Sequence, residues 1–158
     1  MTNEIIFLVI VDETPEMYKA LRYAAQRSAR NNGRVALLYT FDILEFSHWK
    51  AVEDIAEVES RDKAESKIKD IENFMTQFNQ KKPKKFIMKG DRIQCIINFL
   101  NENKFISNLV LASSLNKSGS DPLISAFTGK FRSSLNVPVT IIPPNLEEEE
   151  IDKLTSIN

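Results

Sequence analysis

The stretch IIFLVIVDETPEM, residues 5–17, decides the fold class. It begins with a continuous apolar run rich in β-branched residues, which is typical of a strand that is covered on both faces. Signals for a helix start follow directly. Thr14 is a suitable N-cap, Pro15 fits the first helical position, and Glu16 suits the positive end of the helix dipole. The stretch therefore predicts a buried strand that leads into a helix.

The same alternation of strand and helix continues along the chain. Further strands are predicted at 34–41, 105–112 and 136–143, and the basic segment 81–89 is predicted to be a connector that runs into a short strand. Helices are predicted at 51–79, after Asp91, and along the residues spaced four apart, Leu123, Phe127, Phe131 and Leu135. Alternating elements predict an α/β fold, a five-stranded parallel sheet with helices on both faces, and right-handed crossovers favour the flavodoxin-like strand order 3-2-1-4-5.

The bulk properties favour a single α/β domain over residues 1–144, with a tail at 145–158. The single cysteine, Cys95, has no intramolecular partner, which favours a reducing, cytoplasmic setting. No stretch approaches the ~20 apolar residues of a membrane span. The net charge of −1 gives no general attraction to nucleic acid. We therefore expect neither a membrane nor a nucleic acid as a partner.

The predicted strand order places a ligand crevice beyond the carboxyl ends of the first and fourth strands, where the winding direction switches. Its two sides are then Asp12–Thr14 and Ala112–Gly119. The second side opens the stretch ASSLNKSGSDPLISAFTGK, residues 112–130, which carries small residues, glycines and lysines. This is where a nucleotide-binding protein of this fold would keep its phosphate loop.

Three short motifs resemble the universal stress protein family, and their order and spacing extend the resemblance over almost the whole chain. VDET at 11–14 resembles the family's V-D-x-S, KGD at 89–91 resembles the start of its third helix, and VPVTII at 137–142 resembles its closing P-V-L-V-V strand. The resemblance implies a dimer through the last strand and often ATP or another adenine nucleotide in the crevice. It also implies that Asp12 lines the adenine end, with Phe41 beside the base.

The phosphate loop departs from the family pattern. Nucleotide-binding members have G-x2-G-x9-G-[ST], and the matching positions here are Ala112, Leu115, Ser125 and Ala126, with the spacing kept and every glycine replaced. Glycine in such a loop takes a positive φ or lets backbone N–H groups approach the phosphates. A leucine held left-handed would cost about 1–2 kcal/mol. We therefore expect a different loop path, with weak or no ATP binding.

An alternative remains open, in which a rearranged loop around Lys117–Ser120 binds ATP or AMP, with slow ATP hydrolysis. Lys130 and Arg132 would add positive charge, although all these side chains also suit an ordinary solvated surface. The candidate nucleotide-binding residues are Asp12, Glu13, Thr14, Phe41, Ala112, Ser113, Leu115, Lys117, Ser125 and Ala126.

Nothing in the sequence indicates a catalytic centre or a metal site. A Walker A loop is absent, because Gly129-Lys130 is followed by Phe131. His48 is the only histidine, so no histidine-based metal cluster can form. No nucleophile is paired with a base at a recognisable spacing. We therefore predict a protein that acts by binding, with no catalytic residue, metal or required cofactor.

Three segments are candidate contact surfaces. Val137–Ile142 would be an exposed apolar sheet edge in a monomer, and pairing it with the same strand of a second copy removes that hazard. KKPKK, residues 81–85, attracts acidic groups or protects an edge strand. Phe46 and Trp49 either pack under the long helix or contact a partner, which would make the protein a partner-binding module.

The tail is predicted to form a short helix. Asn145 is a suitable N-cap, and Glu147 suits the first turn. Ile151 and Leu154 give the helix one narrow apolar stripe. Because so short a helix is unstable alone, we expect it to dock on its own subunit or across a dimer.

Overall fold

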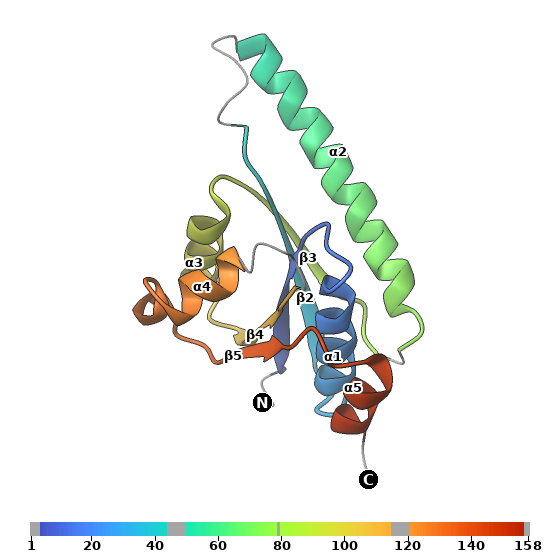
Figure 1. The fold of residues 1–158 in the computed structure, drawn as a ribbon. Coiled ribbons are helices and arrows are strands. Elements are labelled where there is room, and N and C mark those ends of the chain that lie inside the picture. The colour runs from blue at the N-terminus through green and yellow to red at the C-terminus, as the bar shows by residue number, and fades with distance from the viewer. Residues whose placement is uncertain (1–3, 44–49, 79, 115–120, 157–158) are drawn as a thin grey trace.

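The computed structural model describes residues 4–43, 50–78, 80–114 and 121–156. A five-stranded sheet with the order β3-β2-β1-β4-β5 crosses the molecule, and all its pairings are parallel (Figure 1). The predicted α/β class and strand order are confirmed. The strands are β1 (Ile6–Val11), β2 (Arg34–Phe41), β3 (Lys84–Lys89), β4 (Ile106–Ala112) and β5 (Val139–Ile142).

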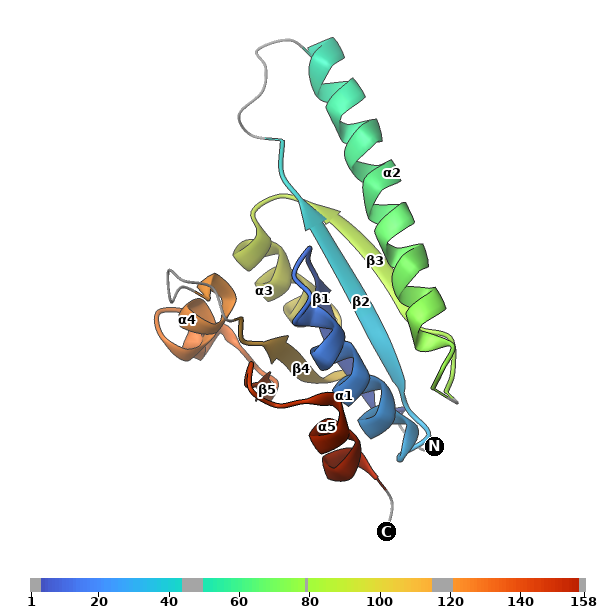
Figure 2. The same ribbon diagram turned by 45° about the vertical axis from the view of Figure 1, so that its right-hand side comes forward.

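Helices cover both faces of the sheet (Figure 2). They are α1 (Met17–Ala29), α2 (Lys50–Met75), α3 (Arg92–Glu102), α4 (Pro122–Thr128) and α5 (Glu148–Thr155), with a 3-10 turn, η1, at Arg132–Ser134. Along β1, alternate side chains enter different cores. Phe7, Val9 and Val11 pack with α1 and α2, whereas Ile6, Leu8 and Ile10 pack with α3. The continuous apolar run is explained by burial on both sides.

The long helix and the third helix follow the sequence pattern closely. Ala64, Ile68, Ile71 and Met75 are all buried on the sheet side of α2. The N-terminal end of α2 extends beyond the sheet (Figure 1). Asp91 caps α3 as predicted, because its carboxylate accepts a hydrogen bond of 3.0 Å from the Gln94 amide. Within the described residues, no helix combines the length and the apolar character needed to cross a membrane.

The start of the first helix differs from the prediction. Thr14 is not the N-cap, because α1 begins at Met17 and Glu16 precedes it. The Thr14 hydroxyl instead donates to Asp12 Oδ1 at 2.6 Å, and the Thr14 amide donates to the same oxygen at 2.8 Å. This local Asx-type turn competes with helix capping for the Thr14 side chain. The chain therefore makes a tight turn before the helix begins.

The fourth helix is shorter than predicted. The spacing from Leu123 to Leu135 suggested one helix, but α4 ends at Thr128 and Gly129 leaves helical geometry at φ −115° and ψ −112°. A Cβ atom at position 129 would lie 2.7 Å from the Ser125 carbonyl oxygen. The chain passes too close to itself there for any other residue, so the glycine both permits the turn and ends the helix.

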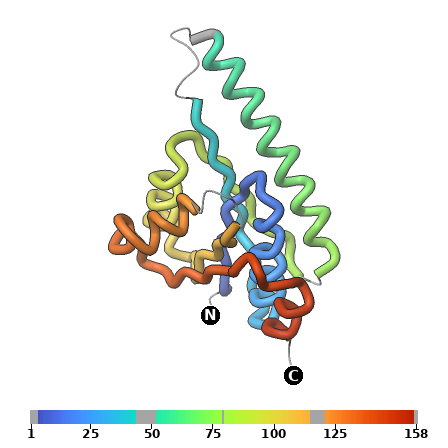
Figure 3. Tube along the Cα trace, viewed as in Figure 1, coloured from blue at the N-terminus to red at the C-terminus, as the bar shows by residue number. Residues whose placement is uncertain are grey.

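The tail helix packs on its own subunit, beside α1 (Figure 3). Glu147 precedes it, so the predicted cap at Asn145 is wrong by two residues. Ile151 is fully buried in the core, whereas Leu154 is 59% exposed, so the expected stripe reduces to one anchoring residue.

Polar side chains of α1 hold this helix and the segment before it, and Arg22 also lies 3.6 Å from the Glu148 carboxylate. Arg22 makes a two-pronged contact with Asp152, with Nε to Oδ1 at 2.7 Å and the second nitrogen to Oδ2 at 2.9 Å. Gln26 donates to the same carboxylate at 2.7 Å. Lys19 donates to the Pro144 carbonyl at 2.8 Å. The α1–α5 junction thus combines one buried isoleucine with a fully bonded carboxylate.

Candidate functional site

A crevice of about 300 Å³ lies at the carboxyl ends of β1 and β4, where the sequence predicts it. It opens between α1 on one side and α4 on the other, with the start of α3 nearby. Its lining is about equally polar and apolar, and the apolar part includes Val9, Val110, Met17, Ala20, Leu123 and Ile124. A pocket at the switch point of an open parallel sheet is the usual ligand site of this architecture.

Among the described residues, the polar groups that line the crevice carry more negative than positive charge. The side chains from the β1 turn are Asp12, Glu13 and Thr14. Arg92 comes from the first position of α3, and Ser114 and Asp121 come from the two ends of the segment after β4. The described part of the crevice therefore presents three carboxylates and one guanidinium group.

Asp12 is held in place by the turn that follows β1. Its Oδ1 accepts both the amide and the hydroxyl of Thr14, while its own amide faces the Met17 sulfur at 3.2 Å. Its second oxygen, Oδ2, accepts no hydrogen bond from the described residues. The Asp12 carboxylate thus has a fixed position and a remaining acceptor atom.

Asp121 crosses back to the end of β4. Its Oδ2 accepts the Ser113 hydroxyl at 3.0 Å, and its Oδ1 accepts the Ser114 amide at 3.2 Å and the Ser114 hydroxyl at 3.0 Å. Burial acts to raise the pKa of Asp121, but the hydrogen bonds from Ser114 and Ser113 outweigh it, so the pKa lies below its ordinary value. Asp121 is therefore an ionised group at the carboxyl end of β4.

Sequence reasoning missed both Asp121 and Arg92. The Asp-Pro pair at 121–122 carried a signal, since an aspartate before a proline marks a helix start. That signal predicts that Asp121 caps α4. In the structure the Asp121 side chain makes no cap hydrogen bond and instead accepts the hydroxyls of Ser113 and Ser114. For Arg92 the local sequence offered no signal, because the helix that carries it comes from a distant part of the chain.

The structure brings together some of the predicted site residues. Asp12, Glu13, Thr14 and Ala112 line the crevice, and Ser113 lies beside it through its bond to Asp121. Two other predicted residues, Leu115 and Lys117, lie outside the described residues, as do Ser118, Gly119 and Ser120.

Three predicted residues lie elsewhere. Ser125 and Ala126 belong to α4 and do not line the crevice, and the Ser125 amide donates to the Asp121 carbonyl within the helix at 2.8 Å. Phe41 is buried against α2, with the Arg61 guanidinium carbon 5.3 Å from its ring centre. Its ring fills a core rather than the crevice.

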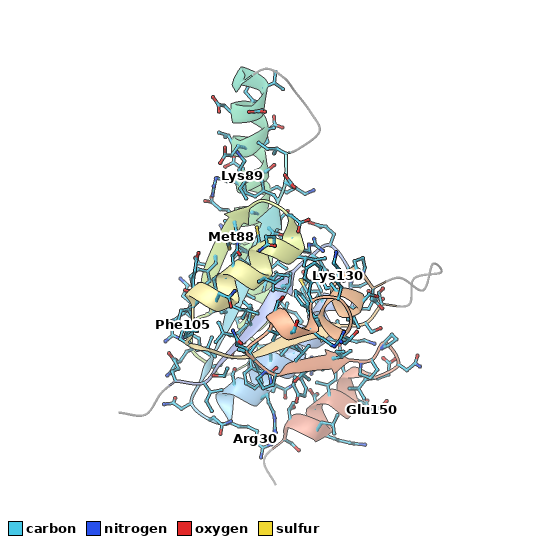
Figure 4. The ribbon with its side chains drawn as sticks, turned by 90° about the vertical axis from the view of Figure 1, so that its left-hand side faces the viewer. Arg30, Met88, Lys89, Phe105, Lys130 and Glu150 are labelled. Carbon is cyan, nitrogen blue, oxygen red and sulfur yellow. The ribbon has the colours of Figure 1, made fainter. Side chains whose placement is uncertain are left out.

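The basic residues after α4, Lys130 and Arg132, make local contacts. Lys130 lies just beyond the helix (Figure 4), with its ammonium 5.3 Å from the Phe131 ring centre. The Arg132 guanidinium donates to the Gly129 carbonyl at 2.9 Å. Neither residue lines the crevice. Their charge near the segment after β4 stays a prediction.

The remaining candidates give no chemical centre in the described part of the chain. Cys95 belongs to α3 and is buried. Burial raises the pKa of its thiol, and the nearby Asp91 and Asp42 add to this effect. No group of three metal-binding side chains occurs among the described residues. His48, Phe46 and Trp49 lie outside those residues.

Several solved structures share this fold. Universal stress protein UspA from Lactobacillus plantarum matches with a TM-score of 0.70 at 16% identity, over 90% of this chain and 99% of that chain. A universal stress protein in complex with cAMP matches with a TM-score of 0.62 at 11% identity, over 89% and 98%. A family protein from Arabidopsis thaliana with AMP bound matches with a TM-score of 0.61 at 16% identity, over 92% and 97%.

The sequence itself matches a family model. No curated protein matches the chain significantly by sequence. The model of the universal stress protein family, however, matches residues 6–143, which include all five strands and both sides of the crevice. Together with the sheet order and the fold shared with the solved structures, this match shows that the chain belongs to the universal stress protein family.

Proposed function

We propose that this chain is a homodimeric, cytoplasmic stress-response protein that acts by binding rather than catalysis, and that it binds ATP weakly or not at all. One observation carries the proposal, namely that the Asp121 carboxylate uses the hydrogen-bond donors at the end of β4. The site residues predicted from the sequence, and the division into a domain at 1–144 and a tail, belong to the same proposal.

Asp121 opposes phosphate binding in two ways. A phosphate site needs free N–H and O–H donors, but Ser113 and Ser114 already donate three hydrogen bonds to this carboxylate. The ionised carboxylate also repels a phosphate placed nearby, because two like charges at about 4 Å oppose each other by roughly 1 kcal/mol even in water. The missing glycines, at Ala112 and Ser125 among others, favour the same conclusion.

Calorimetry with ATP tests this proposal. We expect no saturable ATP binding below about 1 mM, a dissociation constant that corresponds to a binding free energy of roughly −4 kcal/mol. Asp121→Asn removes the charge and keeps the shape, so it should raise ATP affinity several-fold. Asp70→Asn is the matched control, because Asp70 is exposed on α2 and does not line the crevice. Micromolar ATP binding by the unchanged protein would refute the proposal.

The second candidate function is an adenine-nucleotide-binding switch with a rearranged phosphate loop and slow ATP hydrolysis. It is favoured by the solved relatives described with cAMP and with AMP bound. Protein purified without added ligand separates the two candidates. Release of a stoichiometric adenine nucleotide on denaturation would support the second candidate, and its absence would support the first.

The dimer is proposed to form through Val137–Ile142. In the described residues β5 pairs only with β4, so its other edge leaves backbone donors and acceptors unpaired. Ile141 on this strand is 38% exposed. An exposed apolar edge strand promotes aggregation, and pairing with the same strand of a second copy closes it by a two-fold contact.

Sedimentation of two lysine variants tests the dimer. Ile141→Lys places a charge at the proposed interface and should convert dimers to monomers. Leu154→Lys places the same charge at another exposed apolar residue, on α5, and should leave the dimer intact. A monomeric unchanged protein, or equal effects of the two variants, would show that β5 is not the interface.

A further inference from the structure

We propose that the free edge of β3 binds an acidic, extended segment of a partner protein, which joins the sheet as a further strand. This inference goes beyond the proposed function, because it concerns the edge of the sheet opposite to β5 and does not depend on whether a nucleotide binds. Three features carry it: an unpaired strand edge, apolar side chains on both sides of that edge, and an excess of lysines along it.

The outer edge of β3 has unpaired backbone groups. β3 is the last strand on the α2 side of the sheet (Figure 2), and among the described residues it pairs only with β2. The Gly90 amide donates to the Phe41 carbonyl of β2 at 2.8 Å. Since backbone amides alternate in direction along a strand, three amides of β3 point away from β2, namely those of Lys85, Ile87 and Lys89. An exposed edge of this kind binds an extended peptide by strand addition.

Apolar side chains lie on both sides of this edge. On the α2 side, Ile68 and Ile87 line a groove of about 520 Å³. The polar residues of that groove are Glu65, Lys69, Glu72 and Lys85. On the α3 side, Phe86 and Met88 are partly buried and Phe105 is 38% exposed (Figure 4). An added strand directs alternate side chains to the two faces, so it can bury apolar residues on each.

The edge carries an excess of positive charge. The segment 81–89, which contains β3, has five lysines and no acidic residue. Among the described residues, three glutamates pair with four of these lysines: Glu4 with Lys81, Glu57 with Lys89, and Glu72 with Lys82 and Lys85. The Lys84 ammonium instead lies 4.6 Å from the Phe105 ring centre. Glutamates of an added strand would lie opposite lysines, and such cross-strand pairs of opposite charge are stabilising.

The same lysines disfavour a second copy of β3 as the occupant. Two β3 strands side by side would bring lysines together, and like charges on neighbouring strands are destabilising. Lysine on an edge strand protects against pairing with another copy for this reason. β5, the proposed dimer strand, has no charged residue along Val139–Ile142. The two edges of the sheet therefore suit different partners, and an acidic strand is the complement of the β3 edge.

Hydrogen exchange of the full chain, followed by NMR, tests the inference with the blocked peptide Glu-Glu-Val-Val-Val-Glu. Alongside β3 in the parallel direction its glutamates lie opposite the lysines and its valines opposite the apolar centre; the reversed sequence serves the antiparallel direction. We expect either peptide to slow exchange at Lys85, Ile87 and Lys89 at least about tenfold, because these amides become hydrogen-bonded. Exchange at Phe86 and Met88 should not change, because their amides already face β2.

Two further peptides separate the contributions. Lys-Lys-Val-Val-Val-Lys keeps the apolar residues and reverses the charge, and a run of glutamates of equal length keeps the charge alone. Neither should slow exchange along β3. Equal protection by one of them overturns the inference, since apolar contact or charge alone would then explain the binding. Protection that rises with protein concentration in the absence of peptide also overturns it, because a second copy would be the occupant.

Lys85→Pro supplies the sharper test. Proline removes an outward amide and leaves the hydrogen bonds to β2 in place, which is the position where an edge strand tolerates it. It should weaken binding of the acidic peptide at least about tenfold. Lys85→Ala keeps the amide and removes only the charge, so it should weaken binding about threefold. Lys153→Ala, at an exposed lysine of α5, should have no effect.

The outcomes also separate this inference from the proposed function. Equal losses in Lys85→Pro and Lys85→Ala overturn the strand pairing. Denaturant unfolding shows whether Lys85→Pro stays folded, and the exchange pattern of the unchanged chain tests the pairing in either case. Absence of binding of both acidic peptides up to about 1 mM overturns the inference alone, because the proposed dimer and the proposed lack of ATP binding would still hold.

Discussion

Two carboxylates in this molecule, Asp121 and Asp152, are each bonded by several donors, yet they lie in regions with different consequences. Asp152 joins α5 to α1 through the charged guanidinium of Arg22 and the amide of Gln26. Asp121 borders the crevice and is bonded by neutral donors, the hydroxyls and one amide of Ser113 and Ser114. Both have a pKa below the ordinary value.

The comparison shows that the hydrogen bonds to a carboxylate do not by themselves identify its role. At the α1–α5 junction the hydrogen bond from Arg22 is the largest cause of the lowered pKa of Asp152, and Ile151 on the same helix is fully buried. That contact stabilises the fold. At the crevice, Asp121 accepts hydrogen bonds from Ser113 and Ser114, and we propose that these bonds use donors that a phosphate would otherwise take.

The largest expected loss of stability comes from the buried apolar residue of the α1–α5 junction, Ile151. Ile151→Ala should lower the free energy of unfolding by about 2–5 kcal/mol, because it leaves a cavity under a helix that cannot persist alone. Leu154→Ala on the same helix is the control, since Leu154 is 59% exposed and its change should stay within about 0.5 kcal/mol. Denaturant unfolding measures both; equal losses would show that Ile151 is not the anchor.

A smaller effect is expected from the ion pair. Arg22→Met keeps the aliphatic packing and removes the bonds to Asp152, and it should cost about 1 kcal/mol, because the carboxylate is partly exposed and solvent screens the pair. Arg30→Met is the control. Arg30 lies beyond the last turn of α1 (Figure 4) and makes no ion pair with a described residue.

The stability cost of Arg22→Met should depend on pH, because the pKa of Asp152 is lowered. A carboxylate with a lowered pKa in the folded state contributes stability above its unfolded value of about 3.9, and loses it as the pH falls through the folded value. The cost of Arg22→Met should therefore be full at pH 7 and shrink below about pH 3.9. A cost that stays constant under acid conditions would indicate that packing, rather than charge, explains it.

The smallest expected effect on stability is that of Asp121→Asn. The asparagine oxygen can still accept bonds from Ser113 or Ser114, so the free energy of unfolding should change by less than about 1 kcal/mol. The same variant should raise ATP affinity. If it destabilises the protein as much as Ile151→Ala, Asp121 is a structural residue and the contrast between the two regions fails.

The fold was largely predictable because local rules agreed with it. The apolar run at 5–11 predicts a buried strand, and the helical spacing of Ala64, Ile68 and Ile71 predicts the face of α2 that is buried. The errors occur where a contact that local rules do not foresee decides the geometry. Thr14 bonds to Asp12 instead of capping α1, and at Gly129 the close approach of the chain ends α4 before Leu135.

The candidate site was predictable only in position. The sequence by itself determined the alternation of strands and helices, and hence the crevice between β1 and β4, because periodicity and crossover handedness act over short distances. The tertiary structure alone decided which side chains line that crevice. Asp121 reaches Ser113 across eight residues, and Arg92 arrives from another helix, because their positions depend on how the whole sheet packs rather than on neighbouring residues.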